Sequence, residues 1–157
     1  MQWQQAFDPL LTPGARNYWK SHNFRDLPDA LLDLLVDAAG RMPSPHCVIF
    51  IGQTGGAIDR VAPEATAYSH RDTTCIMNVH ARWIEPADDS ACTTWARELF
   101  VATAPFATGG VYVNFSGLHE EADHLHSSVH GTSAERLDQI RSAYDPDGIF
   151  AAAAAAP

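Results

Sequence analysis

The stretch of sequence that decides the fold is TCIMNVHARW, residues 74–83. Apolar and polar side chains alternate along it, with Met77, Val79, Ala81 and Trp83 separated by Asn78, His80 and Arg82. Because successive side chains of a β-strand point to opposite faces, this period of two predicts a strand with one apolar and one polar face. The pattern alone leaves two interpretations of the polar face, the solvent side of a sheet or a functional surface.

Other segments predict two further strands and three helices. Short apolar runs at residues 47–51 and 111–115 are typical of strands. Apolar residues at helical spacing predict amphipathic helices over residues 27–39, from Asp88 to about 104, and from Thr132 to about 144. We expect the first two dozen residues to be irregular, because Pro9, Pro13 and Gly14 interrupt any period there.

The order of these elements is helix, strand, strand, helix, strand, helix, without the strict alternation of a doubly wound parallel sheet. We therefore expect an α+β fold, with a mostly antiparallel sheet and the helices packed on one face. The chain contains no internal repeat and no linker, so residues 1–150 are expected to form one domain. Residues 151–157, AAAAAAP, form a low-complexity tail to which we assign no role.

The composition is that of a globular domain and excludes several partners. The chain has 157 residues, 46% of them hydrophobic, and a formal net charge of -9. Nucleic acids and anionic membranes bind clustered positive charge, so we expect neither as a partner. No apolar run approaches the roughly 18 residues of a membrane-spanning helix. The amino end also lacks the pattern of a signal peptide, so we expect a cytoplasmic protein.

For two further motifs, a purely structural interpretation is favoured over a functional one. Residues 52–56, GQTGG, lack the Lys-Ser/Thr of a phosphate-binding loop and are expected to form a turn. On a helix, His119, Asp123, His126 and His130 would share one face at a spacing compatible with metal binding. No HExxH motif is present, so we favour a solvated polar segment and expect no metal site.

Three groups of motifs, considered together, resemble those of a known family. The stretch YWKS at 18–21 resembles the element that opens the substrate domain of berberine-bridge-like FAD-linked oxidases, and TAYSHR at 66–71 resembles their "TAFPHR" segment. The tail of the same domain, written "YxNY", "YGxNxxRL" and "YDPxNxF", is similar to residues 112–115, 130–137 and 144–150. The resemblance extends over residues 13–150 and implies membership of the vanillyl-alcohol-oxidase superfamily.

The resemblance also implies roles for individual residues. Ile76, Asn78 and His80 would face the substrate, and Tyr112 and Asn114 would approach the flavin ring. Phe115, expected beside the substrate, occupies the position where the family often has a tyrosine base. Phenylalanine cannot accept a proton, so His80 is the catalytic residue that we expect in its place. Ser133 takes the position of an asparagine of the family and is expected to bind the cofactor.

By the same resemblance, the chain is expected to be the substrate-side domain of an FAD-dependent oxidoreductase that oxidises an alcohol, a sugar or a similar carbon centre. Its expected partners are a flavin-binding domain, in the same chain or a separate one, and a small-molecule substrate. FAD is the expected cofactor of the complete enzyme, bound weakly by this chain alone. Self-association through the exposed sheet face is a further expectation. The alternative is a stand-alone module for small-molecule or protein binding that has lost redox chemistry.

Overall fold

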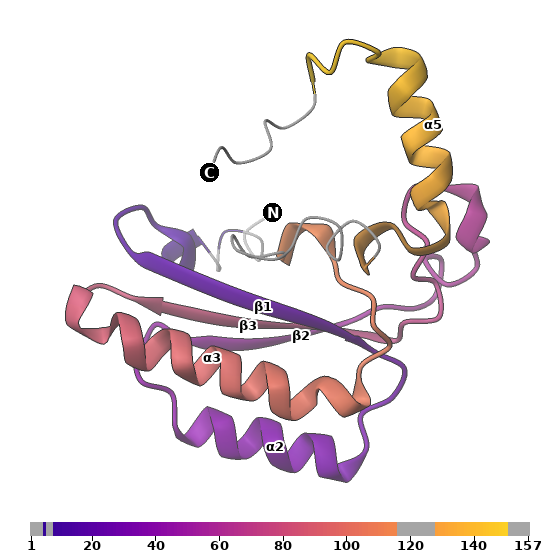
Figure 1. The fold of residues 1–157 in the computed structure, drawn as a ribbon. Helices are drawn as coiled ribbons and strands as arrows, with labels where there is room; N and C mark the ends of the chain where they lie inside the picture. The colour runs from indigo at the N-terminus through magenta and orange to yellow at the C-terminus, as the bar shows by residue number, and fades with distance from the viewer. Residues whose placement is uncertain (1–4, 6–7, 116–127, 151–157) are drawn as a thin grey trace.

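The fold is a three-stranded antiparallel sheet with two helices on one face, seen in a computed structural model that describes residues 5, 8–115 and 128–150 (Figure 1). The strands are β1 Arg16–Phe24, β2 Val48–Gln53 and β3 Cys75–Trp83, in the order β1-β3-β2. The helices are α2 Asp29–Gly40, α3 Asp89–Thr103 and α5 Ala134–Tyr144. The predicted α+β class and antiparallel sheet are confirmed.

The central strand is the one that the alternating pattern predicts. β3 is hydrogen-bonded to β1 along one edge and to β2 along the other, and both pairings are antiparallel. Its apolar side chains form the centre of the core, and Met77, Val79 and Ala81 have no solvent exposure. The period of two in this stretch therefore specifies the face of β3 that is packed against the helices.

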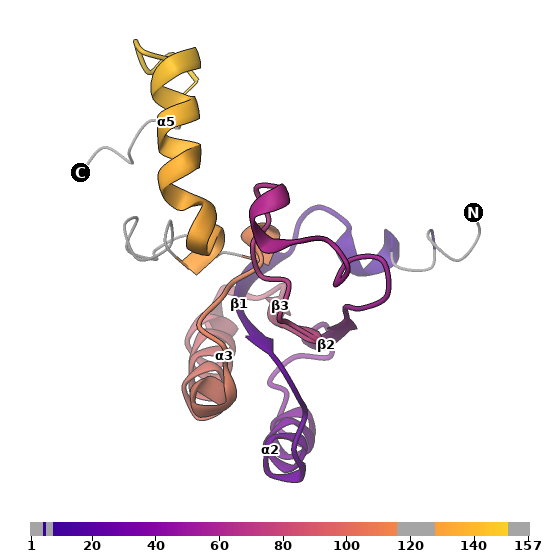
Figure 2. The ribbon, with the colours of Figure 1, turned by 90° about the vertical axis from the view of Figure 1, so that its right-hand side faces the viewer.

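Helices α2 and α3 cover that apolar face, below the sheet in Figure 1. Leu31, Leu35 and Ala38 of α2 are buried in the same core as four residues of α3: Cys92, Trp95, Ala96 and Leu99. The indole Nε1–H of Trp95 also donates a hydrogen bond to the carbonyl of Ala38 over 3.0 Å, which joins the two helices. The third helix, α5, lies beyond the opposite side of the sheet, as Figure 2 shows, and contributes no buried residue.

The prediction of a strand at residues 111–115 is wrong. The prediction that the first two dozen residues are irregular is also wrong, because they contain strand β1. Residues Val113–Phe115 form a short 3-10 helix, η5, in which the Phe115 N–H donates to the Tyr112 carbonyl over 2.8 Å. The third strand is β1, whose sequence RNYWKSHNF has polar residues on both faces and therefore no apolar alternation. Pairing with β3 along its whole length makes this segment a strand, because that pairing satisfies its backbone groups.

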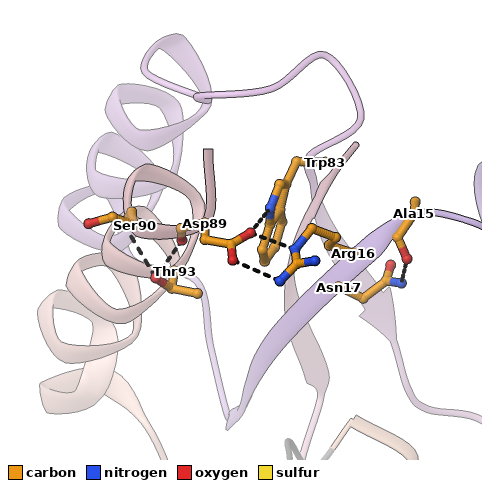
Figure 3. Close-up of polar contacts among 7 residues, drawn as sticks. All are labelled: Ala15, Arg16, Asn17, Trp83, Asp89, Ser90 and Thr93. Carbon is orange, nitrogen blue, oxygen red and sulfur yellow. Dashed lines mark hydrogen bonds and ion pairs between the residues drawn. The ribbon is translucent and has the colours of Figure 1, made fainter. Parts of the chain in front are cut away.

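A carboxylate joins β1, β3 and α3 at one corner of the sheet (Figure 3). Asp89, the first residue of α3, accepts two hydrogen bonds from the Arg16 guanidinium, of 2.6 and 2.8 Å, and one of 2.6 Å from the Trp83 indole. The Trp83 N–H and, to a lesser extent, Arg16 lower the pKa of Asp89. The position of α3 along the sheet is thus held by one residue of β1 and one of β3.

Other sequence expectations lie outside the described residues. They are the tail at 151–157 and three residues of the proposed histidine cluster, His119, Asp123 and His126. Within residues 8–115 and 128–150, no helix has the length and apolar character needed to cross a membrane.

The core predicts a sharp contrast between two substitutions. Met77→Ala should destabilise the fold by about 2–5 kcal/mol, because it removes a fully buried side chain from the centre of the helix-facing layer. Val36→Ala is the control, since Val36 is 73% exposed on α2 and should change stability by less than about 0.5 kcal/mol. Urea unfolding of both variants measures the difference, and equal midpoints would contradict the assigned core.

Candidate functional site

The sheet face that points away from α2 and α3, called here the open face, collects most of the residues singled out by sequence. Side chains opposite each other in the register share a face, and the register of the three strands gives its members. These are Ile76, Asn78, His80 and Arg82 from β3, Asn17, Trp19, Ser21 and Asn23 from β1, and Val48 and Phe50 from β2.

The polar residues of β3 on the open face are not exposed to solvent. Asn78, His80 and Arg82 are only 6–8% exposed, although they do not belong to the apolar core that β3 forms with α2 and α3. The Trp19 ring lies 4.8 Å from the His80 ring, and η5 lies over the sheet on this side (Figure 1). The interpretation of the polar stripe as wetted surface is therefore wrong. Buried polar groups are costly unless they are hydrogen-bonded, so the partners of this stripe decide what it contributes.

An aromatic cluster leads from the open face to the loop before β3. Phe50 lies 6.1 Å from Phe115, Phe115 lies 5.2 Å from Tyr112, and Tyr112 lies 6.4 Å from Tyr68 (centroid distances). All three contacts are edge-to-face, the arrangement favoured by the ring quadrupoles. The cluster places η5 against β2 and forms an aromatic wall along one side of the open face.

Asn17 selects the tautomer of the His80 ring. Asn17 uses its Nδ2–H to donate to the Ala15 carbonyl over 2.9 Å, so its Oδ1 is the atom that faces His80 Nε2, also at 2.9 Å. His80 Nε2 therefore carries the ring proton, and Nδ1 is the acceptor atom. Burial lowers the pKa of His80, and the positive charge of Arg82 lowers it further. In this tautomer Nδ1 is the ring atom able to accept a proton from a bound molecule.

Several buried polar atoms of the open face have no hydrogen-bond partner among the described residues. They are Ser21 Oγ, both side-chain polar atoms of Asn23, and Asn78 Oδ1. Ser21 and Asn78 are opposite each other in the β1–β3 register. A buried polar group without a partner costs about 1–3 kcal/mol. Their concentration on one face indicates a surface suited to polar contacts from another molecule or domain.

The structure brings most of the predicted site residues together. Ile76, Asn78 and His80 share the open face, and Phe115 joins them through Phe50. Tyr112 and Asn114 lie at the outer end of the aromatic wall, where the Asn114 amide donates to the Tyr112 hydroxyl over 2.9 Å.

Ser133 lies elsewhere. It is buried, and its hydroxyl donates to the Thr66 carbonyl over 3.3 Å, between the short helices η2 Pro63–Ala65 and η6 Gly131–Ser133. The described residues also contain no group of three His, Cys, Asp or Glu side chains able to hold a metal ion.

Sequence reasoning missed the contribution of β1 and of the loop before β3. The strand RNYWKSHNF places every second residue on the open face: Asn17, Trp19, Ser21 and Asn23. The residues between them are also polar or aromatic, so no alternation of apolar and polar side chains indicated a strand. Tyr68 was part of a quoted motif without a role. Its hydroxyl is buried without a hydrogen-bond partner in the part of the chain that the structure describes, and the Arg71 guanidinium lies over its ring at 4.9 Å.

Comparison with known proteins gives relatives of one kind, although no family model matches the chain. An uncharacterized FAD-linked oxidoreductase, YgaK, from Bacillus subtilis is 28% identical over 108 residues, which cover 69% of this chain and 23% of that protein. A chitooligosaccharide oxidase from Gibberella zeae is 26% identical over 122 residues, covering 73% and 25%. The berberine bridge enzyme-like C-1 protein of Nicotiana tabacum is 25% identical over 127 residues, covering 73% and 22%.

Solved structures agree on the fold. The berberine bridge enzyme-like protein #28 from Arabidopsis thaliana superposes with a TM-score of 0.73 at 18% identity, covering 87% of this chain and 32% of that one. The glycopeptide hexose oxidase DBV29, solved with teicoplanin, gives a TM-score of 0.71 at 22% identity, covering 85% and 30%.

These relatives and structural neighbours are FAD-linked oxidases of the berberine bridge enzyme-like, or vanillyl-alcohol oxidase, family, and the predicted resemblance is confirmed. The chain spans about a quarter of the length of the curated relatives that it matches.

The environment of His80 predicts a pH effect. Arg82→Gln should raise the pKa of His80, because it removes the neighbouring positive charge. In the parent protein the pKa of His80 is lower in the folded state than in the unfolded state, so the unfolded state binds the proton first. The free energy of unfolding of the parent should therefore fall as the pH drops below about 6.5. NMR titration of the His80 ring measures the shift. Arg97→Gln, which removes a guanidinium stacked on Tyr18 of the helix-facing side, is the control and should leave the pKa of His80 unchanged.

Proposed function

We propose that this chain is the substrate-side domain of an FAD-dependent oxidoreductase, part of a longer protein or one of two separate halves. The observation that supports this most is the open face, where unpartnered polar atoms and aromatic rings share a rigid antiparallel sheet. The relatives, all FAD-linked or oxidase proteins, are about four times longer than the segment that they share with this chain. The proposed face would cover the flavin ring and enclose the substrate.

The described residues fit contact with the flavin ring better than contact with its phosphates. Tyr112, supported by Asn114 and Phe115, offers an aromatic edge beside the open face. Arg71 is a cation of the adjoining loop, and its three nitrogen atoms donate to the Tyr68 and Ile58 carbonyls and the Thr66 hydroxyl. Three of the five N–H donors of this guanidinium are therefore already engaged within the loop. The Ser133 hydroxyl is likewise engaged with Thr66 and fits a structural role better than cofactor binding.

Within the complete enzyme, FAD would supply the hydride acceptor, and this chain would orient the substrate and move a proton. His80 Nδ1 is the proposed base for a substrate hydroxyl, since Phe115 cannot accept a proton. Asn78 Oδ1 and Ser21 Oγ would bind further polar groups of the substrate. We propose an alcohol, a sugar or a similar carbon centre as the substrate. Relatives named as oxidases of chitooligosaccharides and of aclacinomycin support this range.

The purified chain should bind free FAD weakly and should carry no flavin at one equivalent. The reason is that its proposed contacts are to the flavin ring, while Arg71 of the adjoining loop already donates to backbone and hydroxyl partners. Absorbance of the purified chain and equilibrium dialysis with FAD measure this. Flavin that copurifies at one per chain would show that the proposed division of roles is wrong.

A chimera tests the catalytic role. In it, this chain replaces the matching segment of the Bacillus subtilis relative. With an alcohol or sugar that reduces the flavin of the parent chimera, His80→Ala should slow flavin reduction about 10²–10⁴-fold, the usual contribution of a general base. The parent rate should fall as the pH drops through the depressed pKa of His80, and the variant should lose this dependence.

Asn78→Ala should weaken substrate binding in the same chimera. The control is Val36→Ala, on the exposed side of α2, which should change neither rate nor pH profile. Equal rates and pH profiles for the parent and His80→Ala would refute the assigned base. Stopped-flow absorbance of the flavin is the measurement for all of these variants.

A further inference from the structure

Helix α5 and the turn after it expose a row of apolar side chains. None of the eleven residues of α5 is buried. Ile140 is 43% exposed and Tyr144 is 85% exposed, and their spacing of four places them on the same side of the helix. Ile149 and Phe150, just beyond the helix, are 75% and 87% exposed. These four residues are called here the α5 tip.

The α5 tip is held in one conformation without the help of apolar burial. The Asp145 carboxylate accepts the Ile149 N–H at Oδ1 over 2.7 Å and the Phe150 N–H at Oδ2 over 2.8 Å. The Gly148 N–H donates to the Asp145 carbonyl over 3.1 Å, and Gly148 has a φ of 66°, which glycine adopts without strain. Large apolar side chains presented by an ordered backbone are typical of interface anchors, because less entropy is lost on binding.

The amino end of α5 fixes its direction relative to the sheet. The Arg136 guanidinium donates to the Glu64 carbonyl, and Ser133 donates to the Thr66 carbonyl, both over 3.3 Å. From this attachment α5 extends away from the body of the domain, on the side of the open face and not of α2 and α3 (Figures 1 and 2). A body that covers the open face would therefore also lie near the α5 tip.

We propose that the α5 tip is a docking surface for the flavin-binding portion of the enzyme. This inference rests on the proposed function and adds a second contact, outside the substrate site, that sets how the two portions are oriented. Two observations favour this occupant over a second copy of the chain. About three quarters of the length of these relatives lies outside the segment that they share with this chain, so a large covalent neighbour is available. The net charge of -9 opposes close approach of two copies.

The test compares two sets of substitutions in the isolated chain and in the Bacillus subtilis chimera. The tip variant is Tyr144→Ser, Ile149→Ser and Phe150→Ser. The control variant is Val36→Ser and Val101→Ser, which removes side chains that are 73% and 70% exposed on α2 and α3. In the isolated chain both variants should keep the parent melting temperature, since none of these side chains is buried; this shows that both fold.

Amide hydrogen exchange over residues 134–150 is the readout. We expect exchange in the parent chimera to be at least about 10-fold slower than in the isolated chain, because docking suppresses local opening of α5. The tip variant should lose this protection and the control should keep it. Equal exchange in chimera and isolated chain would overturn the inference, even where the His80 substitution still slows flavin reduction. Protection that arises in the isolated chain together with dimer sedimentation would assign the tip to a second copy and overturn it as well.

Discussion

The structure depends on a single constraint, the complete enclosure of strand β3. Both edges of β3 are hydrogen-bonded, to β1 and to β2, and seven consecutive residues from Met77 to Trp83 are buried. A strand enclosed in this way cannot shift its register by one residue without exchanging its apolar and polar faces. The elements on either side of the sheet are positioned relative to β3: α2 and α3 by its apolar face, and η5 with its aromatic wall by its polar face.

Burial of a polar face has a cost that the fold only partly offsets. His80 is hydrogen-bonded to Asn17 and its ring contacts Trp19. Arg82 donates hydrogen bonds to the carbonyl and the hydroxyl of Thr12. Ser21, Asn23 and Asn78 retain polar atoms that have no hydrogen-bond partner within residues 8–115 and 128–150. A domain that served only as a scaffold would gain stability from apolar residues at these positions. The retention of amides and hydroxyls on the rigid sheet is consistent with a surface built to contact other groups, as in a substrate site positioned by a firm scaffold.

The two proposed contact surfaces differ in their chemistry. The open face combines a neutral histidine, amides and aromatic rings, which suits orientation of a polar substrate beside a flat cofactor ring. The α5 tip is apolar and lies outside this site, with its backbone held by Asp145. A division of this kind separates reaction chemistry from domain orientation, so that each can be altered by substitution without the other.

Sequence alone determined the central strand, the helices α2 and α3, the α+β class and the family resemblance, because each depends on a local period or a short motif. It also placed Asn78 and His80 on one face, since the period of a strand is a property of its own residues. Tertiary structure decided which segment pairs with β3. The stretch VYVNF at 111–115 has a stronger strand pattern than RNYWKSHNF, yet the edge of β3 is occupied by β1.

Tertiary structure also decided that the polar face is buried, that Asn17 sets the tautomer of His80, and that Ser133 supports the loop before β3 and not the open face. These outcomes depend on contacts between residues far apart in the sequence. His80 and Asn17 are 63 positions apart, and Ser133 and Thr66 are 67 positions apart. A local pattern contains no information about such distant partners, because they meet only when the sheet has formed.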